Sequence, residues 1–244
     1  MVVSRGQKSD KPILHVPYHN ISPQLVVLLY ASIFFLAIFY YIIGTLFFNS
    51  PLTFKEYLVF TSVLGVVIVG GYQLFFWTQY HNTKFKTRCY RIWLDDLIPH
   101  IPSFIWIYNL SYYVIIGLVL VTLSSLEQGL YYIFGGLILL TVHCIIFYFF
   151  PSVVPAHWRD YKAASKAQKF LKFVQKLDRG RNCMPSMHMS VATYVSLLLL
   201  PALSYYSFVF IALIGVSCLL VKQHTIPDIA PGIVLGWLVY ALLF

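Results

Sequence analysis

Charged side chains are scarce in this sequence of 244 residues, and acidic ones are the scarcest. Only 10% of the residues are charged and eight are acidic, whereas 59% are hydrophobic and 18% are aromatic. This composition lies outside the range of soluble domains and therefore excludes a soluble globular fold. The chain is predicted to be an integral, multi-pass membrane protein.

Cysteine is also scarce, and the positions of the four cysteines exclude two kinds of site. Cys89 and Cys183 fall in polar segments, while Cys144 and Cys218 fall in apolar runs. Their spacing matches neither a zinc site nor a disulfide framework. No acidic cluster is available to hold a catalytic cation. We expect neither a metal nor another cofactor.

Long charge-free runs dominate the rest of the sequence. They cover residues 25–48, 57–78, 104–126, 130–150, 189–221 and 229–244. A helix needs about 20 apolar residues to span a bilayer, so the run 189–221, with Pro201 and Ser204 near its middle, is predicted to be a hairpin of two helices. The predicted fold is an all-α polytopic bundle of about seven transmembrane helices. A single catalytic domain would occupy residues 25–244, after a polar tail at residues 1–24.

Residues 156–178 form a basic segment with the period of an amphipathic helix. Apolar and lysine side chains alternate at spacings of three and four: Ala163, Ala167, Phe170, Leu171, Val174 and Leu177 against Lys162, Lys166, Lys169, Lys172 and Lys176. We expect a helix lying flat on the membrane surface, either as an anchor to anionic headgroups or also to draw lipid headgroups towards the neighbouring motif. Nucleic acid would also suit a net charge of +9, but no nucleic-acid-binding module is present.

The basic residues also predict the orientation of the chain. If seven helices alternate, one side carries 16 of the 17 lysines and arginines, and the other side has only Lys55. The positive-inside rule places the basic side in the cytosol.

Two polar motifs lie at the two ends of the predicted hairpin. His224 and Asp228 are four residues apart, so in a helix they share a face and the carboxylate can orient the imidazole. At the other end His188 follows Ser186, and a histidine beside a serine can protonate a leaving oxygen and bind phosphate. The hairpin would bring both motifs to one membrane face and form a phosphoryl-transfer site there.

The motifs Pro185-Ser186-Met187-His188 and Lys222-Gln223-His224-Thr225-Ile226-Pro227-Asp228 resemble the second and third signature motifs of the type-2 phosphatidate phosphatase superfamily. Segments 95–103 and 150–155 resemble more narrowly the branch that contains inositol phosphorylceramide and sphingomyelin synthases. The resemblance covers roughly residues 95–244. It implies a six-helix family core, to which the first helix of this chain is added.

The resemblance also implies roles for individual residues. His224 would attack phosphorus and become a phosphohistidine, while Asp228 holds and activates it. His188 would protonate the leaving alkoxide, and Ser186 would bind phosphate. The implied activity is metal-independent hydrolysis of a membrane lipid phosphomonoester. Transfer of a phospho-headgroup to an alcohol acceptor is the alternative, and a non-catalytic lipid-binding protein is a third.

The sequence departs from the family in the residues that bind phosphate. Cys218 stands where the third motif usually has an arginine, and Lys222 is the nearest replacement. The first motif is not cleanly present, and we expect Arg179 and Arg181 to reach the phosphate. The missing arginine favours the lipid-binding alternative. Retention of both histidines and of Asp228 argues against it.

Three further residues have two interpretations each. His143 lies within an apolar run, where an ionisable residue is either functional or a neutral histidine bonded to a backbone carbonyl. Asp95 and Asp96 bind either the start of a helix or an incoming headgroup. The sequence does not predict an oligomeric state.

The orientation can be tested with a single reporter cysteine in the loop 151–187, introduced after Cys183 has been removed. We expect a membrane-impermeant thiol reagent to label it only after the cells have been permeabilised, because the basic loops stay in the cytosol. Labelling in intact cells would show that the chain has the inverse orientation.

Overall fold

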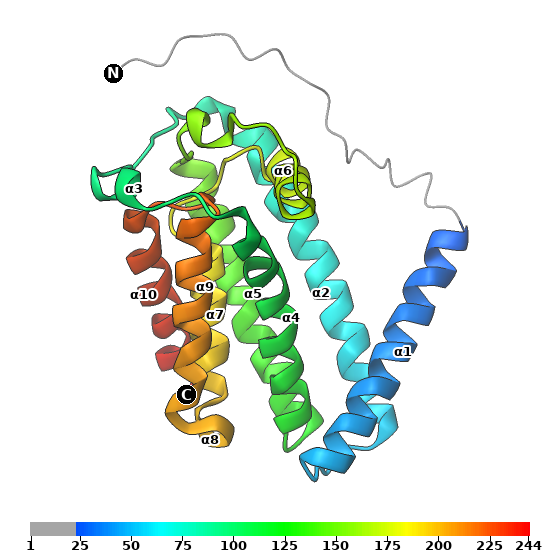
Figure 1. The fold of residues 1–244 in the computed structure, drawn as a ribbon. Coiled ribbons are helices and arrows are strands. Elements are labelled where there is room, and N and C mark those ends of the chain that lie inside the picture. Colours follow the sequence, from blue (N-terminus) through cyan, green and yellow to red (C-terminus); the bar gives the residue numbers. More distant parts are fainter. Residues whose placement is uncertain (1–22) are drawn as a thin grey trace.

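The computed structural model describes residues 23–244, which form a bundle of helices joined by short loops (Figure 1). The polar tail predicted for residues 1–24 falls almost entirely outside the described residues. The α-helices are α1 (Pro23–Phe47), α2 (Phe54–His81), α3 (Leu94–Leu97), α4 (Ile105–Thr122), α5 (Leu126–Phe149), α6 (Lys166–Asp178), α7 (Met187–Leu198), α8 (Leu200–Leu203), α9 (Phe208–Leu220) and α10 (Ile226–Leu243). Short 3₁₀-helices are η2 (Asn82–Lys84), η3 (Pro102–Phe104), η4 (Ala156–Arg159) and η5 (Ser204–Ser207).

The predicted polytopic helical bundle is confirmed, but the count of seven spanning helices is not. Six segments of the described chain are long and apolar enough to cross a membrane: Val27–Phe47, Phe54–Lys84, Pro102–Thr122, Leu126–Phe149, Leu200–Leu220 and Ile226–Leu243. Helix α7 has only 12 residues. At 1.5 Å per residue it is about 18 Å long, shorter than the hydrocarbon core of about 30 Å.

Helices α7 and α9 form the predicted hairpin, and the short α8 and η5 make its turn. Both ends of the hairpin therefore lie at one end of the bundle, where α10 also begins (Figure 1). Helices α7 and α10 thus run parallel, with their first turns side by side. The backbone N–H of Ser186 donates to the carbonyl of Asp228 at 3.0 Å, which joins the two helix starts directly.

Two glycines of α10 allow it to pack closely against α7. A Cβ atom at Gly232 would lie 2.6 Å from the backbone oxygen of Ser186, and one at Gly236 would lie 2.3 Å from that of Ser190. Real Cβ atoms do not approach a carbonyl oxygen this closely. Small residues spaced four apart are a common way for membrane helices to bring their backbones together.

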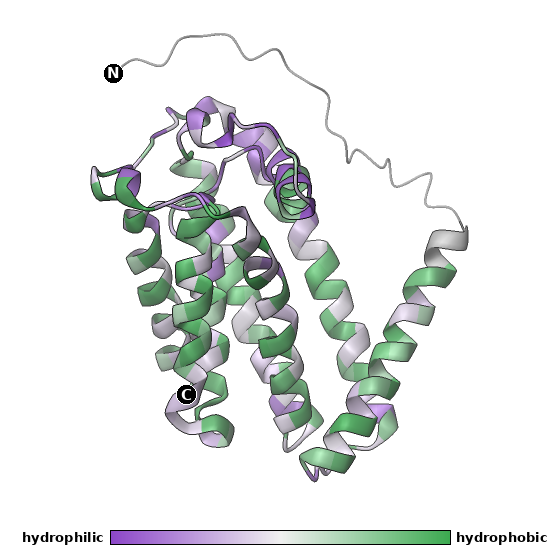
Figure 2. Cartoon of the chain, viewed as in Figure 1, coloured by the Kyte–Doolittle hydropathy of each residue, from purple (hydrophilic) through white to green (hydrophobic). Residues whose placement is uncertain are grey.

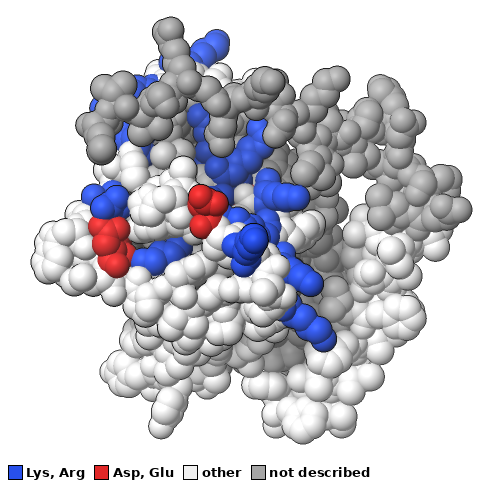
Figure 3. All heavy atoms as spheres, turned by 45° about the horizontal axis from the view of Figure 1, so that its top comes forward, with Lys and Arg blue, Asp and Glu red and all other residues white. Residues whose placement is uncertain are grey.

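The end of the bundle that carries the motifs is also its polar end. Hydrophilic residues concentrate there, whereas the rest of the helices is largely hydrophobic (Figure 2). Viewed from this end, lysines and arginines spread over the surface and only a few acidic groups lie among them (Figure 3).

The basic amphipathic helix lies at this polar end, but it is shorter than predicted and less exposed. Helix α6 begins only at Lys166, capped by Ser165, and residues 160–165 do not continue it from η4. Its apolar side packs on α4 and η3, with Leu171 fully buried and the ring of Phe170 stacked on Trp106 at 5.0 Å. Protein contacts cover much of the face that the sequence assigned to the membrane.

The close approach of α7 and α10 gives a testable prediction at Gly236. We expect Gly236→Ala to destabilise the protein by about 1–3 kcal/mol, because the added methyl group must push the two backbones apart. The matched control is Gly136→Ala in α5, where a Cβ would meet nothing within 4 Å. The midpoint of thermal unfolding in detergent should fall for Gly236→Ala and not for Gly136→Ala. Equal midpoints for the two variants would contradict the claim that α7 and α10 need a glycine at position 236 in order to pack.

Candidate active site

Ser186 and His188 lie at the first turn of α7. The hydroxyl of Ser186 accepts from the backbone N–H of Met189 at 3.4 Å, so the serine is the N-cap of the helix. Ser186 is fully buried, and its position is also fixed by the backbone bond to Asp228. His188 is thereby placed in the first turn of α7, where backbone N–H groups and the helix dipole favour an anion.

His224 lies in the turn before α10, and one side of its ring is fixed. Its Nδ1 is 3.0 Å from the carbonyl oxygen of Cys183 and 3.5 Å from a carboxylate oxygen of Asp228. Both neighbours are acceptors, so Nδ1 carries the proton and Nε2 keeps its lone pair. The same Asp228 oxygen accepts from the N–H of Thr225 at 2.8 Å, so the backbone carbonyl is the closer partner of the imidazole.

The two histidines face each other, with ring centroids 5.6 Å apart and planes at 61°. His188 stacks on Tyr108 of α4 at 4.2 Å, and the ring of Tyr112 meets it edge-on at 5.0 Å. The Tyr108 hydroxyl is 3.3 Å from Nδ1 of His188. Within residues 23–244, no hydrogen bond occupies Nε2 of either histidine. The site therefore pairs two open ring nitrogens, with an aromatic wall on the side of His188.

Ser152 helps to position His224, and sequence reasoning did not single it out. Its buried hydroxyl accepts from the backbone N–H groups of Cys183 and Met184, at 2.9 and 2.7 Å. These bonds fix the segment whose carbonyl, that of Cys183, holds His224. The available signal was its position in the segment 150–155, which resembles the family but offered no chemical role for the serine.

Asp95 binds the start of a helix, which decides between its two interpretations. It is buried, and its carboxylate accepts from the N–H of Ile226 at 2.7 Å, at the beginning of α10, and from the N–H of Ile92 at 2.8 Å. Asp96 instead forms an exposed ion pair with Arg91 at 2.5 Å.

Lys222, a predicted phosphate ligand, already contacts protein groups. Its ammonium donates to the carbonyl oxygen of Asp95 at 2.6 Å and lies over the ring of Trp158 at 4.5 Å. Burial lowers the pKa of Lys222, and the charges of Asp95 and Asp96 oppose this shift. The hydrogen bond holds the ammonium of Lys222 against α3.

The two predicted arginines lie against the end of α2. Arg181 donates to the carbonyl of Gln79 at 3.1 Å and to the hydroxyl of Thr87 at 3.3 Å. Arg179 donates to the hydroxyl of Tyr80 at 2.7 Å and also lies over its ring. These contacts point both side chains to residues 79–87.

A different arginine lies beside His224. Arg159, at the end of η4, donates to the side-chain oxygen of Gln223 at 2.6 Å, and Gln223 directly precedes His224. It also forms an ion pair with Asp178 at 2.7 Å. No motif contains Arg159, so only the folded chain places a guanidinium at this position.

His143 has the backbone partner that the second of its two interpretations predicts. Its Nδ1 is 2.8 Å from the carbonyl of Leu139, the predicted backbone partner. Its Nε2 is 3.1 Å from the hydroxyl of Ser190, which is also 3.1 Å from the carbonyl of Ser186. Through Ser190, His143 therefore supports the first turn of α7.

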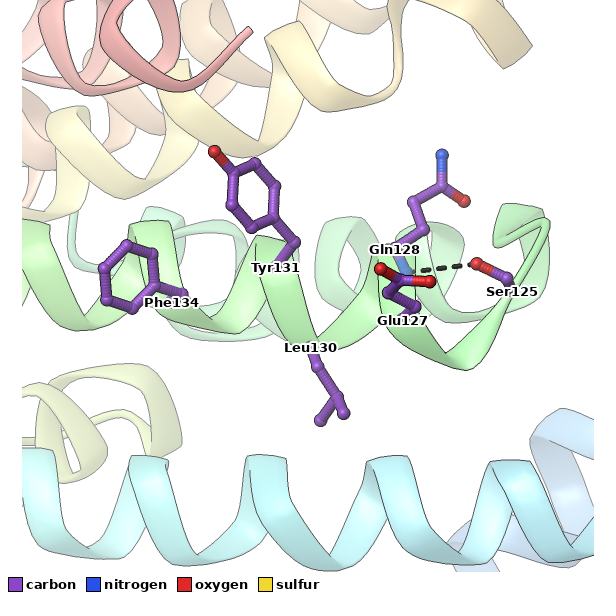
Figure 4. Close-up of a pocket in the computed structure, with 6 residues that line it drawn as sticks. All are labelled: Ser125, Glu127, Gln128, Leu130, Tyr131 and Phe134. Carbon is purple, nitrogen blue, oxygen red and sulfur yellow. Dashed lines mark hydrogen bonds between the residues drawn. The ribbon is translucent and has the colours of Figure 1, made fainter.

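One pocket, of about 570 Å³, lies at the start of α5, and Figure 4 shows its residues. Its lining consists of Ser125, Glu127, Gln128, Leu130, Tyr131 and Phe134. These residues include a carboxylate and no cation, and none belongs to either motif. The pocket is unsuited to a phosphate and lies at the end of the bundle opposite the histidines.

Comparison with known proteins finds a family whose model covers both motifs. A family model described as the PAP2 superfamily matches residues 89–242, which include both motifs, the hairpin and Arg159. No curated protein and no solved structure matches the chain. The matched region covers more than half of the chain, and the protein belongs to the PAP2 superfamily, the type-2 phosphatidate phosphatases and their relatives.

Proposed function

We propose that the protein hydrolyses a membrane lipid phosphomonoester through a phosphohistidine at His224. The observation that carries this proposal is the opposed pair of histidines. His224 has Nδ1 held by a carbonyl and Nε2 open, and the ring of His188 lies 5.6 Å away. An imidazole held in one tautomer is a competent nucleophile, and a second imidazole beside it can handle the leaving group's proton.

Each step balances with these two side chains. Nε2 of His224 forms the bond to phosphorus while the bond from phosphorus to the lipid oxygen breaks, and His188 gives that oxygen a proton. In the second step His188 takes a proton from water, whose oxygen attacks phosphorus and releases phosphate from His224. The Tyr108 hydroxyl lies at Nδ1 of His188, so Nε2 is the ring nitrogen that gives and takes the proton in these two steps. Asp228, at 3.5 Å, stabilises positive charge on the His224 ring.

The location of the site suits a lipid substrate. The histidines lie where α7 and α10 begin, at the polar end of a bundle whose helices are otherwise largely hydrophobic (Figure 2). A lipid can keep its acyl chains in the bilayer while its phosphate meets the basic end, so no charge enters hydrocarbon. We place this end in the cytosol because it carries nearly all the lysines and arginines.

Transfer of the phospho-headgroup to an alcohol is the second candidate. The aromatic wall formed by Tyr108 and Tyr112 favours it, because a dry wall beside the base discourages attack by water. In both reactions His224 attacks phosphorus and the lipid alcohol leaves. In transfer the donor is a phosphodiester whose phosphorus keeps its headgroup, and an alcohol replaces water in the second attack. A non-catalytic lipid-binding protein would not need a nucleophile oriented opposite a second histidine.

Kinetics of histidine variants test the proposal. His224→Ala should abolish turnover of labelled lipid phosphates, because it removes the atom that bonds to phosphorus. His188→Ala should lose at least 10²-fold in kcat/KM with a lipid substrate and much less with p-nitrophenyl phosphate, whose leaving group needs no proton. His81→Ala is the control, since His81 stacks on Trp77 outside the site.

Analysis of the products separates the two reactions. Purified protein is incubated with labelled lipid phosphates, with labelled phospholipids as headgroup donors and with candidate alcohol acceptors, and both free phosphate and new lipid species are measured. Hydrolysis predicts free phosphate whether or not an acceptor is added, and transfer predicts a new phospholipid that requires one. Turnover by His224→Ala at the wild-type rate would contradict both.

A further inference from the structure

The guanidinium of Arg159 has one edge in use and another without a partner. Nη1 donates to the carboxylate of Asp178 at 2.7 Å and to the carbonyl of Gln175 at 2.9 Å, while Nη2 donates to Gln223 at 2.6 Å. Gln223 in turn donates to the second carboxylate oxygen of Asp178 at 2.7 Å. This ring of bonds occupies the edge formed by the two terminal nitrogens.

The Nε–H of Arg159 is buried and has no hydrogen-bond partner. A buried N–H without an acceptor loses its bond to water and gains none in return, and the cost is larger on a charged group, so native structures seldom keep one without a reason. Other buried atoms of the described chain also lack partners, but they belong to neutral side chains. Arg159 is the case in which the unpaired donor is cationic.

The position of Arg159 is fixed from several sides. Asp178 holds one nitrogen and also accepts from the N–H of Gly180 at 2.8 Å. A Cβ at Gly180 would lie 2.8 Å from the central carbon of the guanidinium, so only glycine leaves room for it. The side chain is therefore held in place before any ligand arrives.

Its surroundings connect Arg159 to the nucleophile through two neighbours of His224. Gln223 precedes His224 in the chain, and Cys183 supplies the carbonyl that holds its ring. Burial and Asp228 raise the pKa of the Cys183 thiol, and the positive charge of Arg159 opposes that shift.

We propose that Arg159 is the phosphate ligand of this site, and that its Nε–H binds a non-bridging oxygen of the phosphoryl group transferred to His224. This inference rests on the proposed phosphoryl transfer. A guanidinium edge matches phosphate oxygens in geometry and in charge. Negative charge on those oxygens must be balanced when phosphorus becomes five-coordinate, and a donor fixed beforehand does so without reorganisation. Cys218 offers no charge, and Lys222 is engaged with Asp95.

Binding of inorganic phosphate tests the proposal without turnover. The full chain carrying His224→Ala, purified in detergent, is titrated with inorganic phosphate by calorimetry. Addition of Arg159→Gln should weaken phosphate binding at least tenfold, and addition of Arg159→Lys should weaken it less because the charge is retained. The matched control is Arg181→Gln, whose guanidinium is bonded to Gln79 and Thr87, and it should change the affinity less than twofold.

A measurement on the unmodified chain covers the case in which Arg159→Gln does not fold. In protein labelled with [¹⁵N]arginine, the Nε–H resonance of Arg159, assigned from Arg159→Lys, should shift as phosphate saturates the site. An unshifted resonance at saturating phosphate would overturn the proposal, as would a folded Arg159→Gln protein that binds phosphate with unchanged affinity.

The outcomes also separate this inference from the proposed function. Phosphate binding that depends on Arg159, in a wild-type protein that turns over no lipid phosphate, would support the ligand and contradict the catalytic proposal. Turnover that depends on His224 but is unchanged in Arg159→Gln would support catalysis and contradict the ligand.

Discussion

The close approach of α7 and α10 is the constraint on which the rest of the site depends. Each helix contributes one histidine near its N-terminal end, and the rings can face each other only if the two backbones lie side by side in register. Gly232 and Gly236 permit that approach, and the bond from Ser186 to Asp228 fixes the register at the polar end. Hydrophobic burial cannot specify it, because lipid solvates apolar helix surfaces as well as protein does.

Around this contact, polar groups are placed by partners that are distant in sequence. Ser152 fixes the carbonyl that holds His224, and Asp95 binds the N–H of Ile226 where α10 starts. Asp178 holds Arg159 beside Gln223. In a chain with few charges, each of these groups is engaged because an unpaired polar atom away from water is costly. Among the described residues, Nε of Arg159 is the unpartnered buried atom that belongs to a charged side chain, and for that reason we assign it to the ligand.

The sequence predicted much of the fold because it depends on local composition. Charge-free runs located the long helices to within a few residues, and a single proline and serine placed the turn of the hairpin. The pairing of His188 with His224 followed from the hairpin, since any hairpin returns its two ends to one face. The backbone partner of His143 was also predicted correctly.

What the sequence could not predict depends on contacts between distant segments. Asp95 reaches a residue 131 positions away, and no periodicity encodes that bond. The apolar stripe of α6 looked like a membrane-facing surface because composition does not distinguish lipid from a neighbouring helix. Lys222 was a reasonable candidate ligand by spacing, yet its side chain bonds to Asp95, while Arg159, which lies outside every motif, reaches the neighbour of His224.

The most direct test of the account is to trap the covalent intermediate and map it. Protein is mixed with a phosphate-labelled lipid, quenched in alkali, in which phosphohistidine is stable, and digested for mass spectrometry. The account predicts an acid-labile phosphate on His224 and none in His224→Ala. Phosphate on another residue, or turnover without any protein-bound phosphate, would contradict it.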